Sequence, residues 1–378
     1  MKNQKICIIG DGLTGLTTAI TLRKLNLNID LFCSKYNGNS KKDKRVTAIS
    51  ENSYKFLKEN VDLKKNRYFW PCKKINLFYE NQGKHLNFLN YKSKDKNLMY
   101  VFENLKFTKH LINELKKYKN VNFFNKSIKE INYEHSFVKF DNKKIHYDLI
   151  ILCTGSKNNF YKNLNLGRSI NKDYKEFAIT GSIQHNLKIN ASSQYFLKEG
   201  PLAILPFKKN VFSLVWSISK DLFKQDIRIL VRKKLEHIFG SKAKIKILEI
   251  QSFPLYLNLK TKYFKKNVLI LGQGIHSIHP IAGQGFNLIL RDIQRLDSII
   301  EKNLNLGIGI KDSYILKEFY DSRNPENTLI GLGNDLIRIF FKRNKLTDPI
   351  KNILLKNIGK NESIKKVSRV ISDKGLFA

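Results

Sequence analysis

Residues 268–287, Val-Leu-Ile-Leu-Gly-Gln-Gly-Ile-His-Ser-Ile-His-Pro-Ile-Ala-Gly-Gln-Gly-Phe-Asn, decide how the rest of this chain is interpreted. The apolar run at the start predicts a buried strand, and the His279-Pro280 step predicts a turn because the residue before proline avoids the helical region. The glycines that follow predict the start of a helix. Such a turn directs backbone N–H groups and the positive end of a helix dipole at an electron-rich ligand.

A second glycine-rich turn lies at the start of the chain. An apolar run over residues 5–9 is followed by Gly10-Asp11-Gly12-Leu13-Thr14-Gly15, then by helical spacing to about Leu25 and by a second strand over 29–33. A G-x-G-x-x-G turn in this setting is typical of a dinucleotide-binding site, the alternative being a plain βαβ turn. In such a site Gly10 permits the tight turn, Gly12 lets a pyrophosphate approach the backbone, and Gly15 lets helix and strand pack closely.

The acidic residue that would hold an adenosine ribose is missing from the end of the second strand. That place falls to Cys33, with Ser34 next, while Asp30 lies inside the strand and is expected to face elsewhere. Ser34 or a backbone group remains as a substitute ribose ligand.

Composition restricts the class of protein. A chain of 378 residues with 42% hydrophobic residues can bury a large core, predicts two domains and argues against disorder. The net charge of +37 favours attraction to nucleic acid or to an anionic membrane surface, or else reflects a genome-wide drift toward Lys and Asn codons. Lysines are spread along the chain without a nucleic-acid-binding signature, so no specific nucleic-acid partner is expected.

The cysteines and the longest uncharged stretch of the sequence indicate the cellular compartment in which the protein is expected. Cys7, Cys33, Cys72 and Cys153 lack metal-ligand spacing, and three of them lie in strand-like runs, which predicts reduced, buried thiols and no metal site. Residues 267–290 contain too many glycines and polar side chains for a lipid-facing helix. No signal peptide is visible, so we expect a cytoplasmic protein, soluble or bound peripherally to the inner face of the membrane.

The middle and end of the chain predict further elements. A helix is expected over 101–118, a buried strand over 147–152, strand-like segments with one intervening helix over 177–254, and helices over 313–374 with breaks near Pro325, Pro349 and Gly359. Buried strands suit a mostly parallel sheet, so the strand-rich middle region is predicted to be a second domain inserted into a nucleotide-binding domain.

These pieces, in this order, resemble the FAD-dependent aromatic hydroxylases of the para-hydroxybenzoate hydroxylase fold. More narrowly, they are similar to the UbiH/UbiF-type monooxygenases of ubiquinone biosynthesis. The segments that carry the resemblance are residues 276–292, 200–206, 213–216, 253–255 and the later Tyr320-x-x-Arg323.

The resemblance implies an α/β fold: a Rossmann-like FAD-binding domain, an inserted β-sheet substrate domain and a C-terminal helical region. The expected ranges are 1–72, 98–172 and 262–310 for the FAD-binding domain, 73–97 and 173–261 for the substrate domain, and 311–378 for the helical region.

It also implies roles for individual residues. Pro280 would flank the reactive edge of the flavin, Arg45 and Asn104 would contact the cofactor, and backbone N–H groups at the 283–285 helix start would face its negatively charged side. The implied FAD-binding residues are Gly10, Gly12, Leu13, Thr14, Gly15, Arg45, Asn104, Gly155, Gly272, Gln273, Gly283, Gln284, Gly285, Phe286 and Asn287. Neither His276 nor His279 is assigned a catalytic role: each could relay protons or shape the turn.

Two positions depart from the family pattern. Thr154 replaces the acidic residue of the second fingerprint, with no arginine soon after, and Gln273 replaces the acidic residue that binds the ribityl chain. The resemblance implies NAD(P)H as the electron donor; because the second fingerprint is tied to this reductant in the family, its departure leaves a separate reductase or ferredoxin as the alternative.

The implied reaction is hydroxylation of the aromatic ring of a polyprenyl phenol, with O2, through a C4a-hydroperoxyflavin. The alternatives are hydroxylation of a soluble phenol and a catalytically impaired flavoprotein subunit of a quinone-biosynthesis complex. Near the C-terminus, Ile364, Val367 and Ile371 recur at helical spacing among basic residues. This pattern fits peripheral membrane contact or packing on the protein itself.

Overall fold

A computed structural model describes residues 4–33, 43–63, 68–156, 159–164, 166–342 and 348–376. Its first large element is a six-stranded sheet of order β18-β19-β12-β1-β2-β8, parallel except for the β18–β19 pair. The strands are β1 Lys5–Ile9, β2 Asn28–Phe32, β8 Val121–Phe124, β12 Leu149–Leu152, β18 Phe264–Lys265 and β19 Val268–Ile270. The two strands predicted to be buried, β12 and β19, are adjacent and completely buried.

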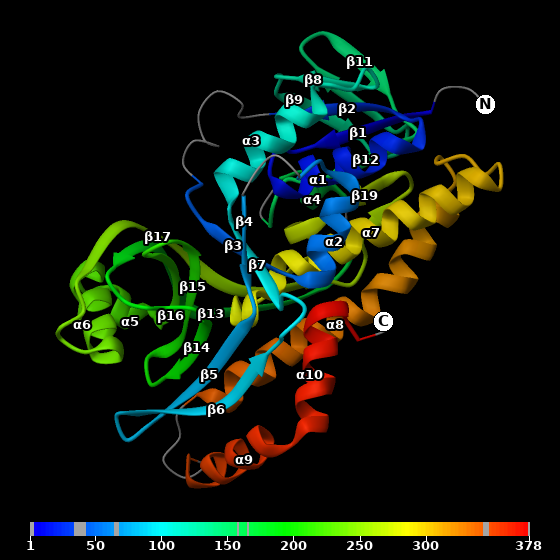
Figure 1. The fold of residues 1–378 in the computed structure, drawn as a ribbon. Helices are drawn as coiled ribbons and strands as arrows, with labels where there is room; N and C mark the ends of the chain where they lie inside the picture. The colour runs from blue at the N-terminus through cyan, green and yellow to red at the C-terminus, as the bar shows by residue number, and fades with distance from the viewer. Residues whose placement is uncertain are drawn as a thin grey trace.

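Helices cover this sheet and form the larger hydrophobic core with it (Figure 1). They are α1 Leu13–Leu22, α3 Asn104–Leu115, α4 Phe160–Leu164 and α7 Gln284–Asn305. α1 packs between α3 and α7, because eight of its ten residues are buried and it can therefore contact a neighbour on more than one side.

Two small sheets flank the first. One consists of β9 Ile128–Asn132, β10 Phe137–Phe140 and β11 Lys143–His146, and the other of β3 Val46–Ser50, β7 Met99–Glu103 and β4 Phe69–Cys72, with α2 Glu51–Asn60 following β3. The helix predicted from residue 101 was wrong at its start, since Val101 pairs with Ala48 in the β3–β7 ladder and the helix begins at Asn104. Strand pairing here outweighs the local helical spacing.

An eight-stranded sheet of order β20-β17-β13-β16-β15-β14-β5-β6 builds the second half of the molecule. Its strands are β5 Lys74–Asn81, β6 Lys84–Lys92, β13 Ser169–His185, β14 Ser192–Leu197, β15 Gly200–Lys208, β16 Val211–Ser219, β17 Ile245–Lys260 and β20 His276–Ser277. α5 Lys220–Phe223 and α6 Ile227–Phe239 pack on it around a second core that includes Trp216. The predicted domain boundaries stay a prediction; β20, from within the range assigned to the FAD-binding domain, pairs with β17 of this sheet.

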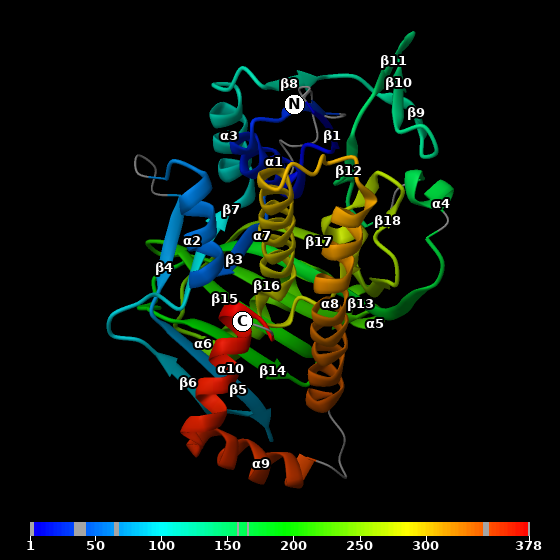
Figure 2. The same ribbon diagram turned by 90° about the vertical axis from the view of Figure 1, so that its right-hand side faces the viewer.

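Three helices end the chain: α8 Ser313–Phe341, α9 Asp348–Lys360 and α10 Glu362–Lys374 (Figure 2). The predicted break at Pro325 was wrong, since α8 continues through it. Proline removes one helical hydrogen bond, but Arg323, Glu326 and Asn327 on either side of it anchor α8 through buried polar contacts. Within the described ranges, no helix is both long and apolar enough to cross a membrane.

Candidate active site

The three glycines of the first turn lie in three different environments. Gly10 has φ +125°, and a Cβ on it would overlap the Cys153 carbonyl, while a Cβ on Gly15 would overlap the carbonyl of Gly10. Gly12 has no atom within 4 Å of the place its Cβ would take. The turn is thus closed on the side of the sheet and open above Gly12.

The start of α1 completes an anion-binding arrangement. Its N-cap is Gly12 in an extended conformation, without a side-chain cap and without an acidic residue in the first turn. The first N–H groups of a helix lack partners within the helix and carry the positive end of its dipole. At the start of α1 these N–H groups face the open space above Gly12. This arrangement fits the binding of a pyrophosphate.

The start of α7 repeats this arrangement. Gly283, at φ +64°, is its N-cap and again provides no side-chain cap. Asn287 fixes the turn from inside, since its amide donates to the Gly283 carbonyl (3.0 Å) and its oxygen accepts from the Ser50 N–H (2.8 Å). Asn287 is buried, and this positioning by β3 was not predictable from its place in the sequence.

One cavity of about 1660 Å³ joins both helix starts. It is lined by all the predicted site residues except Gly15 and Gly272, with Pro280 in its wall. Gly272 lies just behind, at φ +77°, where a Cβ would lie 2.7 Å from Thr14 Cγ2. The volume exceeds the roughly 300–1,000 Å³ of a site for one drug-sized ligand, so the residues present fit FAD together with a second ligand.

Arg45 enters the cavity wall as half of an ion pair. Its guanidinium binds both carboxylate oxygens of Asp43 at 2.7 Å, and the Asn104 amide donates to the same carboxylate (3.3 Å). Burial alone would raise the pKa of Asp43, but the bonds from Arg45 outweigh it and lower that pKa below its usual range. Asp43 is a site residue that the sequence did not lead us to predict. The presence of an acidic residue two positions before Arg45 could have indicated this ion pair.

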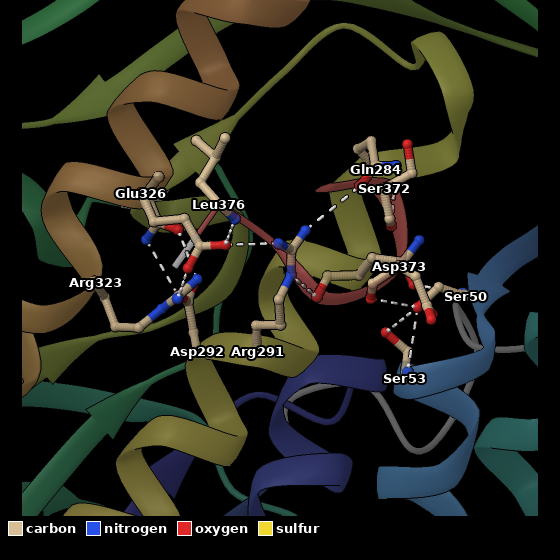
Figure 3. A network of polar contacts seen from close by, with 12 residues as sticks. Ser50, Ser53, Gln284, Arg291, Asp292, Arg323, Glu326, Ser372, Asp373 and Leu376 are labelled. Atoms are coloured by element: carbon tan, nitrogen blue, oxygen red, sulfur yellow. Dashed lines mark hydrogen bonds and ion pairs between the residues drawn. The ribbon is translucent and has the colours of Figure 1, made fainter. Parts of the chain in front are cut away.

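The motif histidines belong to buried ionic contacts. His276 Nε2 lies 2.6 Å from Asp292 Oδ2, and Arg323 Nε donates to the other oxygen of Asp292 (2.7 Å). Arg323 and Arg291 both bind Glu326, so α7 and α8 are joined by alternating charges (Figure 3). Burial alone would raise the pKa of Asp292, but Arg323 and His276 outweigh it and lower that pKa.

His279 makes a separate contact behind the cavity. Its Nε2 lies 3.2 Å from Glu176 of β13, and its carbonyl accepts from the Asn334 amide of α8 (3.3 Å). Both histidines therefore hold the 276–287 segment against neighbouring elements.

The departures from the family pattern have structural counterparts. Asp30 is completely buried and binds Lys5 (2.8 Å), Tyr147 (2.9 Å) and Asn122 (2.9 Å), so it faces away from the cavity. Burial raises the pKa of the Cys33 thiol to about 12, with Asp11 adding to the effect; Ser34 lies outside the described residues.

At the second fingerprint, Thr154 donates to the Tyr161 hydroxyl (2.8 Å), which donates to the Gly155 carbonyl (2.7 Å). Gly155 lies in the cavity wall with open space at its Cβ position, and Gln273 is exposed in the wall. The hydroxyls of Thr154 and Tyr161 thus fix the conformation of the turn that carries Gly155.

The far end of the cavity is apolar and was missed by the sequence reasoning. Its wall there includes Phe88 of β6, Phe196 of β14, Phe341 of α8, and Leu355 and Ile358 of α9. The rings of Phe196 and Phe341 are stacked with centroids 3.5 Å apart. We call these five residues the apolar arm. Because they come from three distant parts of the chain, no sequence motif predicts that they lie together.

Comparison with known proteins agrees with this site. Residues 132–318 match the protein family described as an FAD binding domain. The chain is 24% identical over 343 residues to the mitochondrial ubiquinone biosynthesis monooxygenase COQ6 of Dictyostelium discoideum, covering 71% of this chain and 69% of that protein. It is 29% identical over 155 residues to the 3-demethoxyubiquinol 3-hydroxylase of Escherichia coli K12, covering 40% of each.

Solved structures share the fold across the whole chain. The p-nitrophenol 4-monooxygenase PnpA of Pseudomonas putida DLL-E4 has a TM-score of 0.80 at 13% identity, covering 97% of both chains. HpxO of Klebsiella pneumoniae, solved with FAD and uric acid, has a TM-score of 0.75 at 12% identity, covering 99% of this chain and 98% of that one. The chain therefore contains an FAD binding domain and, over nearly its whole length, has the fold of these solved enzymes.

Proposed function

We propose that this enzyme hydroxylates the aromatic ring of a polyprenyl phenol in ubiquinone biosynthesis. The observation that carries the proposal is the apolar arm, which extends the FAD cavity and suits an isoprenoid tail. The names of the relatives in Dictyostelium discoideum and Escherichia coli support the pathway.

The first contribution of the chain is to hold the cofactor. The open space over Gly12 and the start of α1 would take the pyrophosphate, and the start of α7 would face the pyrimidine side of the flavin. When bound and reduced, FAD reacts with O2 and supplies the oxygen atom that is transferred to the ring. The N–H groups of Gln284 and Gly285 would stabilise negative charge on the cofactor, whereas the Gly283 N–H already donates to the Pro280 carbonyl (3.4 Å).

The second contribution is to place the ring and exclude water. Pro280, in the wall between the start of α7 and β20, would flank the ring where oxygen is transferred. The apolar arm would hold the tail, which fixes the ring relative to the cofactor and keeps the reacting centre dry. NAD(P)H as the reductant is part of this proposal, with a reductase or ferredoxin as the alternative.

Tail recognition is tested by filling the arm. Ile358→Trp places a larger side chain in the arm, so KM for a phenol with a long prenyl tail should rise about tenfold or more while a tail-free phenol is unaffected. Ile229→Trp, on the exposed side of α6, is the matched control. Equal effects on both phenols, or none with Ile358→Trp, would count against tail binding in the arm.

The pathway is tested in cells that lack the enzyme. Mass spectrometry should find a quinone precursor that is missing one hydroxyl group, and normal quinone would refute the proposal. Whether NADH, NADPH or only an added reductase reduces the bound FAD is read from the loss of flavin absorbance without oxygen.

A further inference from the structure

An exposed apolar surface lies on the last two helices, outside the site described above. It consists of Ile350, Ile353 and Leu354 of α9 and Ile364, Val367 and Val370 of α10. We call these six residues the C-terminal apolar patch. Twelve of the twenty large hydrophobic side chains exposed in the described chain lie between Leu329 and Leu376, so their exposure is concentrated in this region rather than scattered.

The patch points outward because the opposite faces of the same helices are already used. On α9, Leu355 is buried and Gly359 lies so close to β6 that a Cβ would overlap the Phe88 carbonyl. On α10, Ser368 contacts Tyr91 of β6 (2.7 Å). Figure 2 shows α9 across one end of the molecule, with α10 running from it toward α7.

Basic side chains are interleaved with the patch. Residues 348–376 contain seven Lys and Arg and three Asp and Glu. Lys356, Lys360, Lys366 and Arg369 are exposed on the same two helices as the apolar residues. A helix with an apolar side flanked by Lys and Arg is the arrangement that lies in the interface of an anionic bilayer.

The cavity that contains the apolar arm also reaches the surface on α8 and α10. Ile337 and Arg369 are exposed, and both also lie in the cavity wall. A ligand that is dissolved in a bilayer touching these helices would therefore meet the opening of the arm without crossing water.

We infer that α9 and α10 bind the surface of an anionic lipid bilayer, and that a lipid-soluble substrate enters the apolar arm from it. The choice of a bilayer over an acidic protein rests on the pairing of a solvent-exposed apolar face with a basic border. The entry of substrate rests on the proposed function; the binding of lipid rests on the surface alone.

The test is vesicle sedimentation of the full-length enzyme with its FAD. Vesicles of phosphatidylcholine alone are compared with vesicles of about seven parts phosphatidylcholine to three parts phosphatidylglycerol. Binding should be strong only to the anionic vesicles. The triple variant Ile350→Ser, Ile353→Ser and Val367→Ser should bind them about tenfold or more weakly.

A matched control removes equally exposed apolar side chains elsewhere. Ile350, Ile353 and Val367 are 60, 64 and 58% exposed, while Ile229, Leu248 and Leu306 are 55, 42 and 66% exposed. The control Ile229→Ser, Leu248→Ser and Leu306→Ser should keep the binding of the unaltered enzyme. Lys356→Glu with Lys366→Glu should weaken binding, whereas Lys188→Glu with Lys209→Glu, which changes the total charge equally, should not.

Equal binding by the two serine triples, or equal binding to neutral and anionic vesicles, would overturn the inference. So would loss of self-association or of a protein complex in the patch triple without any change in vesicle binding. Turnover of a tail-free phenol and the FAD content are measured alongside. Vesicle binding without hydroxylation of a prenyl phenol would refute the proposed function only. Hydroxylation of a prenyl phenol without vesicle binding would refute the docking surface only.

Discussion

Gly12 and Gly15 are three positions apart in one turn, yet their substitution should have opposite consequences. A side chain at Gly12 would enter the open space above the helix start, whereas one at Gly15 would overlap the Gly10 carbonyl. Gly12→Val should therefore fold normally but lose FAD, while Gly15→Val should lose about 1–3 kcal/mol or more of folding stability.

The measurements are flavin absorbance of the purified protein and urea unfolding. Gly285→Val provides a second comparison, because Gly285 also has open space at its Cβ position but lies at the start of α7. Retention of FAD by Gly12→Val would show that the pyrophosphate binds elsewhere.

Glu176 gives a pH dependence whose sign is fixed by its partners. Burial alone would raise its pKa, but the bond to His279 and the charge of Arg338, 2.7 Å away, outweigh burial and lower that pKa below its usual 4.5. A lowered carboxyl pKa stabilises the fold above the unfolded-state pKa, and this contribution is lost as pH falls through the lowered value.

Glu176→Gln should cost about 1–3 kcal/mol at neutral pH, because it removes a charged partner of a half-buried arginine. The difference in unfolding free energy between the variant and the unaltered protein should shrink below about pH 4 as Glu176 becomes protonated. Urea unfolding over a pH series measures this, with Glu59→Gln as an exposed control. A constant difference across the series would contradict the assignment.

At the scale of elements, α10 is fastened to the start of α2 by the Asp373 side chain. The carboxylate accepts from the Asn52 N–H (2.8 Å), and the Asp373 carbonyl accepts from the Ser50 hydroxyl (3.0 Å). A carboxylate at the first turn of a helix also interacts favourably with the helix dipole.

Asp373→Ala should weaken this attachment by about 1–2 kcal/mol. Since α10 lines the cavity, its amides should exchange hydrogen faster and flavin fluorescence should become easier to quench. Glu362→Ala at the other end of α10, where the carboxylate is exposed and binds only Lys365 among the described residues, should change neither.

At the scale of the whole molecule, the +37 charge should give salt-sensitive, non-specific attraction to any polyanion. Binding of a DNA oligonucleotide should fall by orders of magnitude between about 50 and 200 mM salt. Fluorescence anisotropy measures this, and binding that persists at high salt would instead indicate a dedicated nucleic-acid site. Vesicle binding through the C-terminal apolar patch should persist to higher salt concentrations than DNA binding, because salt does not screen the apolar contribution to vesicle binding.

Thiol reactivity tests the prediction that the four cysteines are reduced, buried thiols. Cys7, Cys33, Cys72 and Cys153 are free and buried, and burial raises the pKa of Cys153 to about 12. Neutral, inaccessible thiols react slowly, so a thiol reagent should label the native protein little and label all four after unfolding.

The sequence by itself determined the glycine turns, the buried strands β12 and β19, and the helical end of the chain. These follow from local spacing and from the conformations that only glycine adopts readily. Through the family resemblance it also predicted that Gly12 and Gly283 would contact two ends of one cofactor, and both residues line one cavity in the structure.

The tertiary structure alone decided the rest. It placed Val101 in a strand rather than a helix, carried α8 through Pro325, paired Asp292 with Arg323, and joined β6, β14, α8 and α9 into the apolar arm. The physical reason is that pairing, buried ion pairs and cavity walls depend on groups far apart in the chain. Local spacing contains no information about which of these groups will meet.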